Sequence, residues 1–426
     1  MKRYAINALV DWKNSKHRKP LILKGARQVG KTWLMKRFGE SHFENMAYVD
    51  FHNNSRMNEL FRGDFSTSRL IEGLQAETRE KISPHKTLIV FDEVQEVPLA
   101  LSSLKYFFDN APDYAIIAGG SLLGAALHEG TSFPVGKVDF SNLYPLDYCE
   151  FLEGIGESEL AGILKARDWQ LISAFKSKYI DYLRKYYFVG GMPESVKVYS
   201  EDRDYESVRR VQNNILIAYY DDFSKHIPRD ILPKARSVWN NIPRQLSREK
   251  KRFSPGIIKK GSRIKDYDDA LQWLADAGLI YKIEQISTPS IPLKNYTNEA
   301  FKIYMLDVGL LSCMVELEAR TLLEGEEIFK EFKGALTENF VCQELTSHGK
   351  KLYYWSSERT AEVDYVFKHD SVILPLEVKA EENLHSKSLK VYSEKYNPKL
   401  ALRTSMCDYR EDGWLTNIPL YGIGVF

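Results

Sequence analysis

The sequence predicts a multidomain α/β protein whose first domain is a parallel β-sheet covered by helices. Two observations lead to this fold class. Apolar, strand-like runs alternate with helix-like segments up to about residue 140, as in a parallel sheet with helical crossovers. The chain also has 426 residues, which is too long for one hydrophobic core. We expect strands at 20–23, 47–51, 87–91 and 114–118, and a helix over 67–82.

The first expected strand leads into a glycine-rich loop that is followed by a helix opening. The loop matches the phosphate-binding pattern G-x-x-x-x-G-K-[ST] at every fixed position and reads Gly25-Ala26-Arg27-Gln28-Val29-Gly30-Lys31-Thr32. Backbone N–H groups and the positive end of the helix hold phosphates in such a loop. Lys31 would contact the β- and γ-phosphates, and the Thr32 hydroxyl would bind Mg²⁺. The motif predicts a site for ATP and Mg²⁺, and a chance match to a glycine-containing turn is the alternative.

Two carboxylates stand directly after the apolar run at 87–91. Asp92 would hold Mg²⁺, and Glu93 would orient and deprotonate the attacking water. A solvated strand end is the alternative for this pair. The run at 114–118 leads to Ser121, which would either contact the γ-phosphate or the water, or cap the next helix. Both interpretations of Ser121 stay open.

These motifs, together with the stretches Leu143-Tyr144-Pro145-Leu146 and Glu150-Phe151-Leu152, resemble the AAA-type ATPases of bacteria and archaea that carry a C-terminal domain of unknown function. The resemblance covers nearly the whole chain and implies an ATPase domain at 1–150. In that family a Gly-Arg pair usually precedes the Pro-Leu segment, whereas Gly136 is followed by Lys137 here. Lysine supplies charge without the planar fork of arginine, so the resemblance does not imply activation of a neighbouring subunit by this residue.

Composition and charge narrow the class of protein further. The net charge is +1, so a nucleic-acid surface would have to be local. The four cysteines are scattered without a C-x-x-C pair, which fits a reducing cytoplasm better than a disulfide framework or a zinc site. No apolar run approaches the ~18 residues of a membrane span. We expect a cytoplasmic protein without membrane contact, and the oligomeric state stays open.

The middle of the chain predicts two further parts. Residues 151–230 have helical apolar spacing and are expected to form a helical lid. Residues 231–315 resemble a winged helix, which the family resemblance would make a DNA-binding module. The stretch 248–265 holds eight Lys or Arg residues against one acid, so it would contact phosphates non-specifically or form a solvated loop. The helix expected at 266–277 has four Asp and no Lys or Arg, which argues against sequence-specific groove reading.

The last part, 316–426, contains a second set of charged residues on expected secondary structure. Glu338 lies on a helix, Asp364 on a strand, and Glu377 and Lys379 two residues apart on the next strand, facing the same side. This arrangement resembles the restriction-endonuclease-like fold with its PD-(D/E)xK signature. The resemblance implies that Asp364 and Glu377 bind a divalent metal, with Glu338 as an additional ligand and Lys379 positioning water. A structural salt-bridge network is the alternative.

Two functions are consistent with these patterns. The first is an ATPase that is coupled to nucleic-acid handling, with a nuclease-like C-terminal domain and DNA contacts through 248–265. The second is a nucleotide-controlled switch or assembly factor whose C-terminal domain binds a partner without cleaving it.

Overall fold

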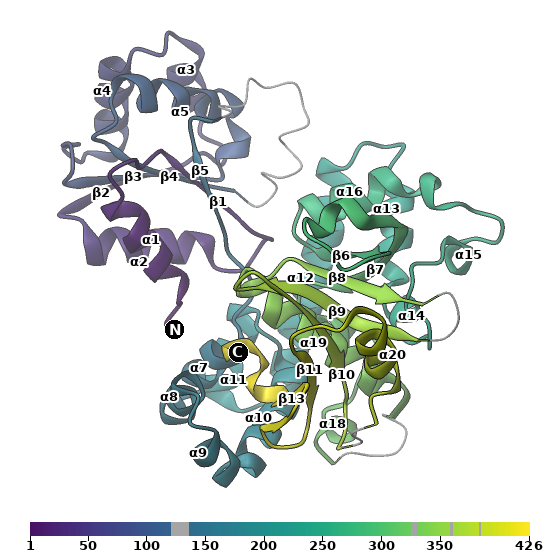
Figure 1. Cartoon of the computed structure of the whole chain (residues 1–426). Coiled ribbons are helices and arrows are strands. Elements are labelled where there is room, and N and C mark those ends of the chain that lie inside the picture. The colour runs from purple at the N-terminus through teal and green to yellow at the C-terminus, as the bar shows by residue number, and fades with distance from the viewer. Residues whose placement is uncertain (121–135, 325–329, 358–360, 383–384) are drawn as a thin grey trace. The chain divides into compact units, whose positions relative to one another are not determined.

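The computed structural model describes residues 1–426 except 121–135, 325–329, 358–360 and 383–384 (Figure 1). The chain divides into two compact units. The N-terminal unit comprises residues 3–144 and 276–278, and the C-terminal unit comprises residues 1–2, 145–275 and 279–426. The four parts expected from the sequence are a finer division than these two units, and that division stays a prediction.

The N-terminal unit contains a five-stranded sheet in the order β2-β3-β4-β1-β5, and all its pairings are parallel. The strands are β1 (Leu21–Lys24), β2 (Asn45–Asp50), β3 (Thr87–Asp92), β4 (Ala115–Gly119) and β5 (Asp139–Asn142). The parallel sheet and its four expected strands are therefore confirmed. The sequence analysis missed β5, whose alternating half-buried pattern lies at the sheet edge beside β1.

Helices cover both faces of this sheet, as Figure 1 shows. They are α1 (Ala5–Asn14), α2 (Lys31–His42), α3 (Ser55–Arg62), α4 (Thr67–Thr78) and α5 (Pro98–Asn110), with a 3₁₀ turn η1 (Val94–Glu96) after β3. α1 and α2 lie on one face, and α3 to α5 lie on the other. The second face holds a continuous apolar core in which Phe61 and Leu74 pack with Ile89 and Phe91 of β3. Because β3 is buried along its whole length, its carboxyl end has a fixed position.

The first part of the C-terminal unit is helical, as expected. Its helices are α7 (Tyr148–Gly154), α8 (Ser158–Ala166), α9 (Trp169–Ala174), α10 (Lys176–Val189), α11 (Pro193–Asp202) and α12 (Tyr205–His226). α12 has 22 residues, and the Asp204 side chain caps its start by accepting from the N–H groups of Glu206 and Ser207. Such a cap satisfies backbone donors that have no partner within the helix.

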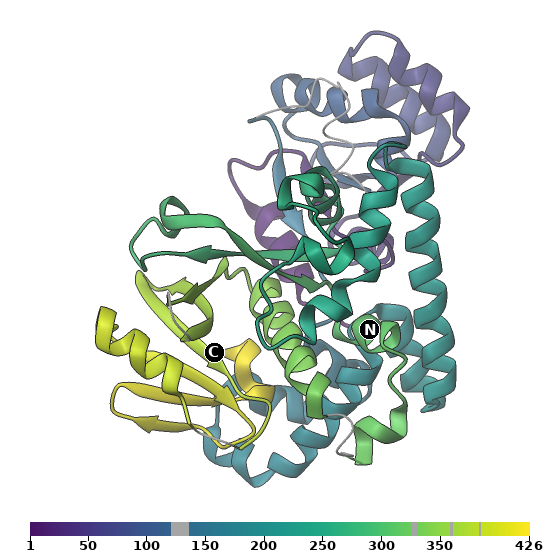
Figure 2. The ribbon, with the colours of Figure 1, turned by 90° about the vertical axis from the view of Figure 1, so that its right-hand side faces the viewer.

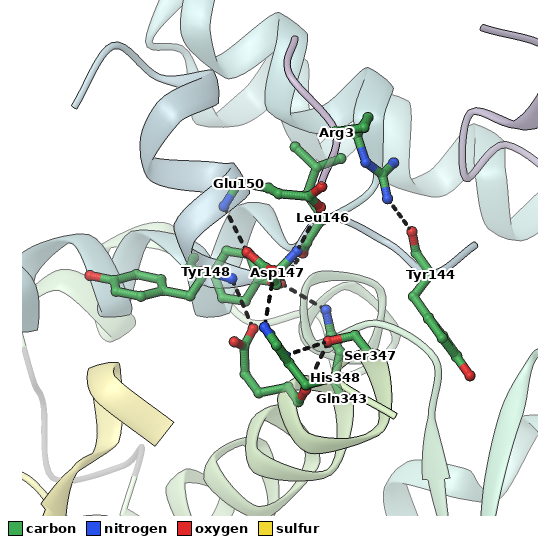
Figure 3. A network of polar contacts seen from close by, with 11 residues as sticks. Arg3, Tyr144, Leu146, Asp147, Tyr148, Glu150, Gln343, Ser347 and His348 are labelled. Carbon is green, nitrogen blue, oxygen red and sulfur yellow. Dashed lines mark hydrogen bonds and ion pairs between the residues drawn. The ribbon is translucent and has the colours of Figure 1, made fainter. Parts of the chain in front are cut away.

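A polar network at the start of α7 connects this helix to α19 (Lys330–Ser347), as Figure 3 shows. Asp147 and Glu150 form a capping box. The Tyr148 N–H donates to Glu344 Oε1 at 2.9 Å, and His348 Nε2 lies 3.5 Å from Asp147 Oδ2. Burial and the neighbouring charge of Asp147 raise the pKa of Glu344 well above its ordinary value. The network fixes α19 against the beginning of the helical region.

A second group of short helices precedes a β-hairpin in the same unit. The elements are α13 (Leu232–Asn240), α14 (Ile242–Leu246), α15 (Pro255–Ile258), η2 (Ile264–Asp266), α16 (Asp268–Asp276), β6 (Ile280–Ile286), η3 (Leu293–Tyr296) and β7 (Thr297–Met305). α17 (Val308–Met314) and α18 (Ala319–Glu324) follow. The expected acidic helix is present as α16, which buries Leu271 and Leu274 while Asp268 and Asp269 stand exposed.

The last part of the chain forms a mixed sheet of eight strands in the order β12-β13-β11-β10-β9-β8-β6-β7. Its further strands and helices are β8 (Leu352–Ser356), β9 (Glu362–His369), β10 (Val372–Val378), α20 (Lys387–Tyr396), β11 (Ala401–Ser405), β12 (Arg410–Asp412), β13 (Leu415–Pro419) and η5 (Leu420–Val425). The β6–β7 hairpin belongs to this sheet, because β6 pairs with β8 in parallel. α19 and α20 lie on opposite sides of the strands (Figure 2).

Candidate functional site

The glycine-rich loop of the N-terminal unit connects the end of β1 to the first turn of α2. Gly30 adopts a left-handed conformation with φ of 94°, and the helix begins at the next residue, Lys31. A side chain at Gly25 would place a Cβ atom 2.4 Å from the carbonyl oxygen of Leu143. Only glycine fits at that position without moving the backbone. The two fixed glycines therefore shape a loop whose following helix presents its N-terminus.

The Lys31 ammonium group lies inside the loop. Its Nζ donates to the carbonyl oxygens of Gly25 and Ala26, each at 2.8 Å. Burial lowers the pKa of Lys31 to about 8, although the carboxylates of Glu93 and Asp92 raise it. The lysine is thus held by loop carbonyls, next to the predicted Mg²⁺ ligand Asp92 and the predicted base Glu93.

The Asp92 carboxylate receives hydrogen bonds from three neutral groups. Its Oδ2 accepts from Thr32 Oγ1 at 2.6 Å and from the Tyr48 hydroxyl at 2.8 Å. Its Oδ1 accepts from the Glu93 N–H at 3.1 Å. Thr32 and Asp92, which were both predicted from the sequence as Mg²⁺ ligands, are therefore in direct contact. The arrangement places two oxygen donors of the kind that Mg²⁺ prefers side by side.

Tyr48 and Gln95 hold the two acids, and the sequence analysis identified neither. Tyr48 lies on β2, beside Val90 of β3, and its pKa is raised by burial and by the bond to Asp92, so the hydroxyl stays a donor. Gln95 Nε2 donates to Glu93 Oε2 at 2.5 Å. An aromatic residue on a strand is typical of a core position, so nothing in the pattern marked Tyr48.

Arg3 is a further residue that the sequence did not reveal. Its guanidinium group is buried and donates to the carbonyl oxygens of Val29, at 2.9 Å, and Tyr144, at 2.6 Å. Figure 3 shows the second of these bonds. Because Val29 is part of the loop, Arg3 ties the loop to the segment after β5. These bonds satisfy two carbonyl groups with a charged donor, which makes them stronger than neutral bonds.

The remaining predicted residues around this loop are accounted for in different ways. Ser121 lies outside the described residues. Lys137 forms an ion pair with Asp109 at 2.6 Å, and its ammonium group lies 4.8 Å from the ring centre of Phe108. The Lys137 charge is therefore paired with an acid of its own unit.

The predicted acids of the C-terminal unit come together on one sheet and one helix. Asp364 lies on β9 and Glu377 on β10, and the antiparallel register that pairs Tyr365 with Leu376 places them on neighbouring strands. Asp364 Oδ2 accepts from the Val378 N–H at 2.8 Å. Burial and the nearby charge of Glu338 raise the pKa of Asp364 to about 7.

Lysine side chains accompany most of these acids. Glu377 Oε1 lies 2.7 Å from Lys379 Nζ, while its buried Oε2 has no hydrogen-bond partner. Glu338, in the middle of α19, has Oε1 2.5 Å from Lys251 Nζ, and its Oε2 accepts from the Tyr304 hydroxyl at 3.0 Å. Burial alone would raise the pKa of Glu338, but Lys251 and Lys302 hold it below its ordinary value.

Lys302 is completely buried and pairs with Glu362. Its Nζ lies 2.5 Å from Glu362 Oε1 and 4.9 Å from the ring centre of Tyr354. Across the part of the chain that the structure describes, no group of three or more His, Cys, Asp or Glu side chains could hold a metal ion. The predicted acids thus lie in one region, but as ion pairs and hydrogen bonds rather than as a set of open metal ligands.

Comparison with known proteins identifies the class of the N-terminal unit. Residues 17–152 match the family profile of an AAA domain. Residues 180–321 and 333–421 match two domains of unknown function, DUF8612 and DUF4143. The chain therefore carries an AAA-type P-loop ATPase domain followed by two domains of unknown function. The AAA match includes the loop at 25–32 and the two acids at the end of β3, Asp92 and Glu93.

Several solved structures show a distant similarity to this chain. One is a Walker-type ATPase of Pyrococcus abyssi, with 15% identity and a TM-score of 0.46 over 74% of this chain and 95% of that chain. Another is the Orc1 protein of Aeropyrum pernix in complex with DNA, with 13% identity and a TM-score of 0.27 over 74% and 90%. PCH-2 of C. elegans has 13% identity and a TM-score of 0.28 over 47% and 62%. No protein with a curated description matches the chain. None of the helices that the structure describes could span a membrane.

Proposed function

We propose that the protein hydrolyses ATP with Mg²⁺ at the loop 25–32. The observation that carries this proposal is the 2.6 Å contact between Thr32 Oγ1 and Asp92 Oδ2, which unites the two predicted Mg²⁺ ligands from separate elements. When bound, Mg²⁺ neutralises phosphate charge in reactions of this class. The N–H groups of the loop would bind the phosphates, Lys31 would reach the terminal phosphates, and Glu93 would take a proton from the attacking water. Ser121 stays a candidate for contact with the γ-phosphate.

Two substitutions test this assignment in complementary ways. Lys31→Ala removes the charge that would hold the terminal phosphates, so both ATP binding and hydrolysis should be lost. Glu93→Gln keeps the shape but removes the base, so ATP should still bind while turnover falls by about 10²–10⁴-fold. Arg37→Ala, which removes an exposed cation of the same helix, is the matched control. Hydrolysis that survives Lys31→Ala in purified protein would refute the proposal.

We further propose that ATP hydrolysis is coupled to nucleic-acid handling through the stretch 248–265. Seven of its eight basic residues have exposed side chains: Arg248, Lys250, Arg252, Lys259, Lys260, Arg263 and Lys265. Exposed cations at this density can neutralise phosphates without reading sequence. Under this proposal residues 231–315 form a winged helix and 316–426 a restriction-endonuclease-like domain, with Asp364, Glu377, Lys379 and Glu338 at its centre.

The second candidate function is a nucleotide-controlled switch whose C-terminal domain binds a partner without cleaving it. The ion pairs Lys251–Glu338 and Lys379–Glu377 favour it, because they use charges that a metal-dependent nuclease would need. Binding of labelled duplex DNA over a salt series separates the two candidates. Steep salt dependence that is lost in a Lys250→Glu, Arg252→Glu variant would support nucleic-acid handling, and binding that is absent or insensitive to salt would favour the switch.

Cleavage is tested separately from binding. Plasmid DNA is incubated with Mg²⁺ or Mn²⁺ and either the wild-type protein or Glu377→Ala. Cleavage by the wild type that disappears in the variant would support a nuclease. Equal cleavage by both proteins would remove the nuclease assignment.

A further inference from the structure

Lys251 differs from its neighbours in the basic stretch 248–265. The other seven basic side chains of this stretch are exposed, whereas the Lys251 side chain is only 13% exposed. Its ammonium group lies 2.5 Å from Glu338 Oε1, on a helix that is 87 residues further along the chain. Four acidic side chains, Glu338, Glu362, Asp364 and Glu377, form a carboxylate cluster in the C-terminal unit. Lys251 therefore belongs to this carboxylate cluster rather than to the surface that could contact phosphates.

Strand β7 carries a second cation, Lys302, and a hydroxyl, Tyr304, that contact the same carboxylate cluster. Lys302 pairs with Glu362 of β9 while completely buried, and Tyr304, two residues further along the strand, donates to Glu338 Oε2. Residues two apart on a strand face the same side of a sheet. The β7 strand and the 248–265 stretch thus converge on the carboxylates from different parts of the sequence.

The side chains present do not fit a divalent metal ion. Such an ion needs several carboxylate oxygens that are open to it. Both oxygens of Glu338 are taken, by Lys251 and Tyr304, and Glu377 Oε1 is taken by Lys379. Asp364 Oδ2 accepts from the Val378 N–H. Glu377 Oε2 is one buried acceptor without a partner, and the other oxygen of the same carboxylate contacts Lys379.

We propose that Lys251 and Lys302 are the counter-ions of the carboxylate cluster and take the place of a divalent metal in the C-terminal domain. This inference rests on the restriction-endonuclease-like arrangement proposed above and changes how its charge is balanced. Two ammonium groups supply the same formal charge as one divalent cation. Lys251 also pairs with the buried Glu338, which would be costly to leave unpaired, and Lys302 pairs with the partly buried Glu362. The domain consequently holds its shape without a metal and lacks the centre that metal-assisted cleavage requires.

Counting bound Mn²⁺ ions on the full chain without nucleotide tests this proposal. We compare the wild type with Lys251→Met and with Lys250→Met, which removes an exposed charge one residue away. The phosphate-loop site is the same in all three proteins, so its contribution cancels. Lys251→Met frees a Glu338 oxygen beside Asp364 and should bind one Mn²⁺ per chain more than the wild type. Lys250→Met should bind the same number as the wild type, and Lys251→Met combined with Glu338→Gln should return to that number.

The results that would overturn the proposal are specific. A folded Lys251→Met protein that binds no more Mn²⁺ than Lys250→Met would overturn it. A Mn²⁺ ion on the wild type that disappears in Glu377→Gln would also overturn it, because the site would then hold a metal with both lysines in place. If Lys251→Met does not fold, this second comparison decides alone, and equal numbers support the proposal. Neither measurement uses ATP hydrolysis or nucleic-acid binding, so failure of the proposed function would be seen separately.

Discussion

The two groups of carboxylates in this protein are held by different kinds of donor. In the N-terminal unit, the described hydrogen bonds to Asp92 come from two hydroxyl groups and one backbone N–H, all neutral. In the C-terminal unit, Glu338, Glu362 and Glu377 each lie against a lysine ammonium group. Neutral donors orient a carboxylate and leave its negative charge in place, whereas an ammonium group cancels that charge. A carboxylate that is held by neutral donors can still attract a cation. A carboxylate that is paired with a lysine contributes to the stability of the fold instead.

The largest expected effect comes from breaking the ion pair of the fully buried Lys302. Lys302→Met leaves the partly buried Glu362 without its cation and removes a positive charge near the buried Glu338 and Asp364, so it should destabilise the C-terminal unit by about 3–5 kcal/mol. Lys302→Met combined with Glu362→Gln removes both charges and should recover most of that loss. Urea unfolding of the full chain measures both variants. A single variant as stable as the wild type would mean that the lysine does not balance this carboxylate.

The next effect concerns Asp364 and depends on pH. Its folded-state pKa of about 7 is above the ordinary value of 3.8, because burial and the Glu338 charge outweigh Lys302 and Lys251. A raised pKa contributes stability that is complete below about pH 4 and is lost as pH rises through about 7. Asp364→Asn does not ionise, so it should be more stable than the wild type by ~1–3 kcal/mol at pH 8 and closer to it at pH 5.

Unfolding curves at pH 5, 6.5 and 8 check the behaviour of Asp364. Asp230→Asn, which changes an exposed acid of the same unit, is the control and should show no such trend. A constant difference between Asp364→Asn and the wild type at all three values would contradict the assignment. It would also weaken the contrast between the carboxylates of the N-terminal unit and the carboxylate cluster of the C-terminal unit.

A smaller effect is expected from the neutral donor at the first site. Tyr48→Phe removes one hydrogen bond to Asp92, worth about 1–1.5 kcal/mol, and should lower the rate of ATP hydrolysis roughly tenfold. ATP binding without Mg²⁺ should change little, because Tyr48 contacts the acid and not the loop. Tyr106→Phe, a tyrosine of the same unit whose ring stacks on Phe65, is the control. If Tyr48→Phe weakens ATP binding without Mg²⁺ as much as it lowers hydrolysis, Tyr48 acts on the loop instead.

The smallest effect should come from Lys137. Its partner Asp109 is about one-third exposed, and ion pairs of this kind contribute roughly 0–1 kcal/mol. Lys137→Met should therefore leave both thermal stability and ATP hydrolysis close to those of the wild type. A large fall in hydrolysis with unchanged stability would instead give Lys137 a role at the nucleotide, despite its ion pair within the unit.

The sequence predicted the parts of this molecule whose signals are local. Apolar runs predicted β1 to β4, and the fixed glycines predicted the loop that the AAA match now supports. It could not predict Tyr48, Arg3, Lys251 or Lys302, since each acts on a residue that is distant in the sequence. Their residue types also have ordinary explanations, as a strand aromatic or as surface cations. The assignment of catalytic and metal-binding roles stays a prediction, because position alone does not establish chemistry.

The pairing of β6 with β8 has a consequence for how the chain can be divided. A fragment that begins at residue 316, where the sequence suggested a boundary, would lack the β6–β7 hairpin and expose one edge of β8. Unpaired backbone groups along such an edge form a template for another chain. We expect that fragment to self-associate and a fragment that begins at residue 231 to do so less, as light scattering would show. We therefore expect the β6–β7 hairpin to shield the β8 edge of its own sheet from aggregation.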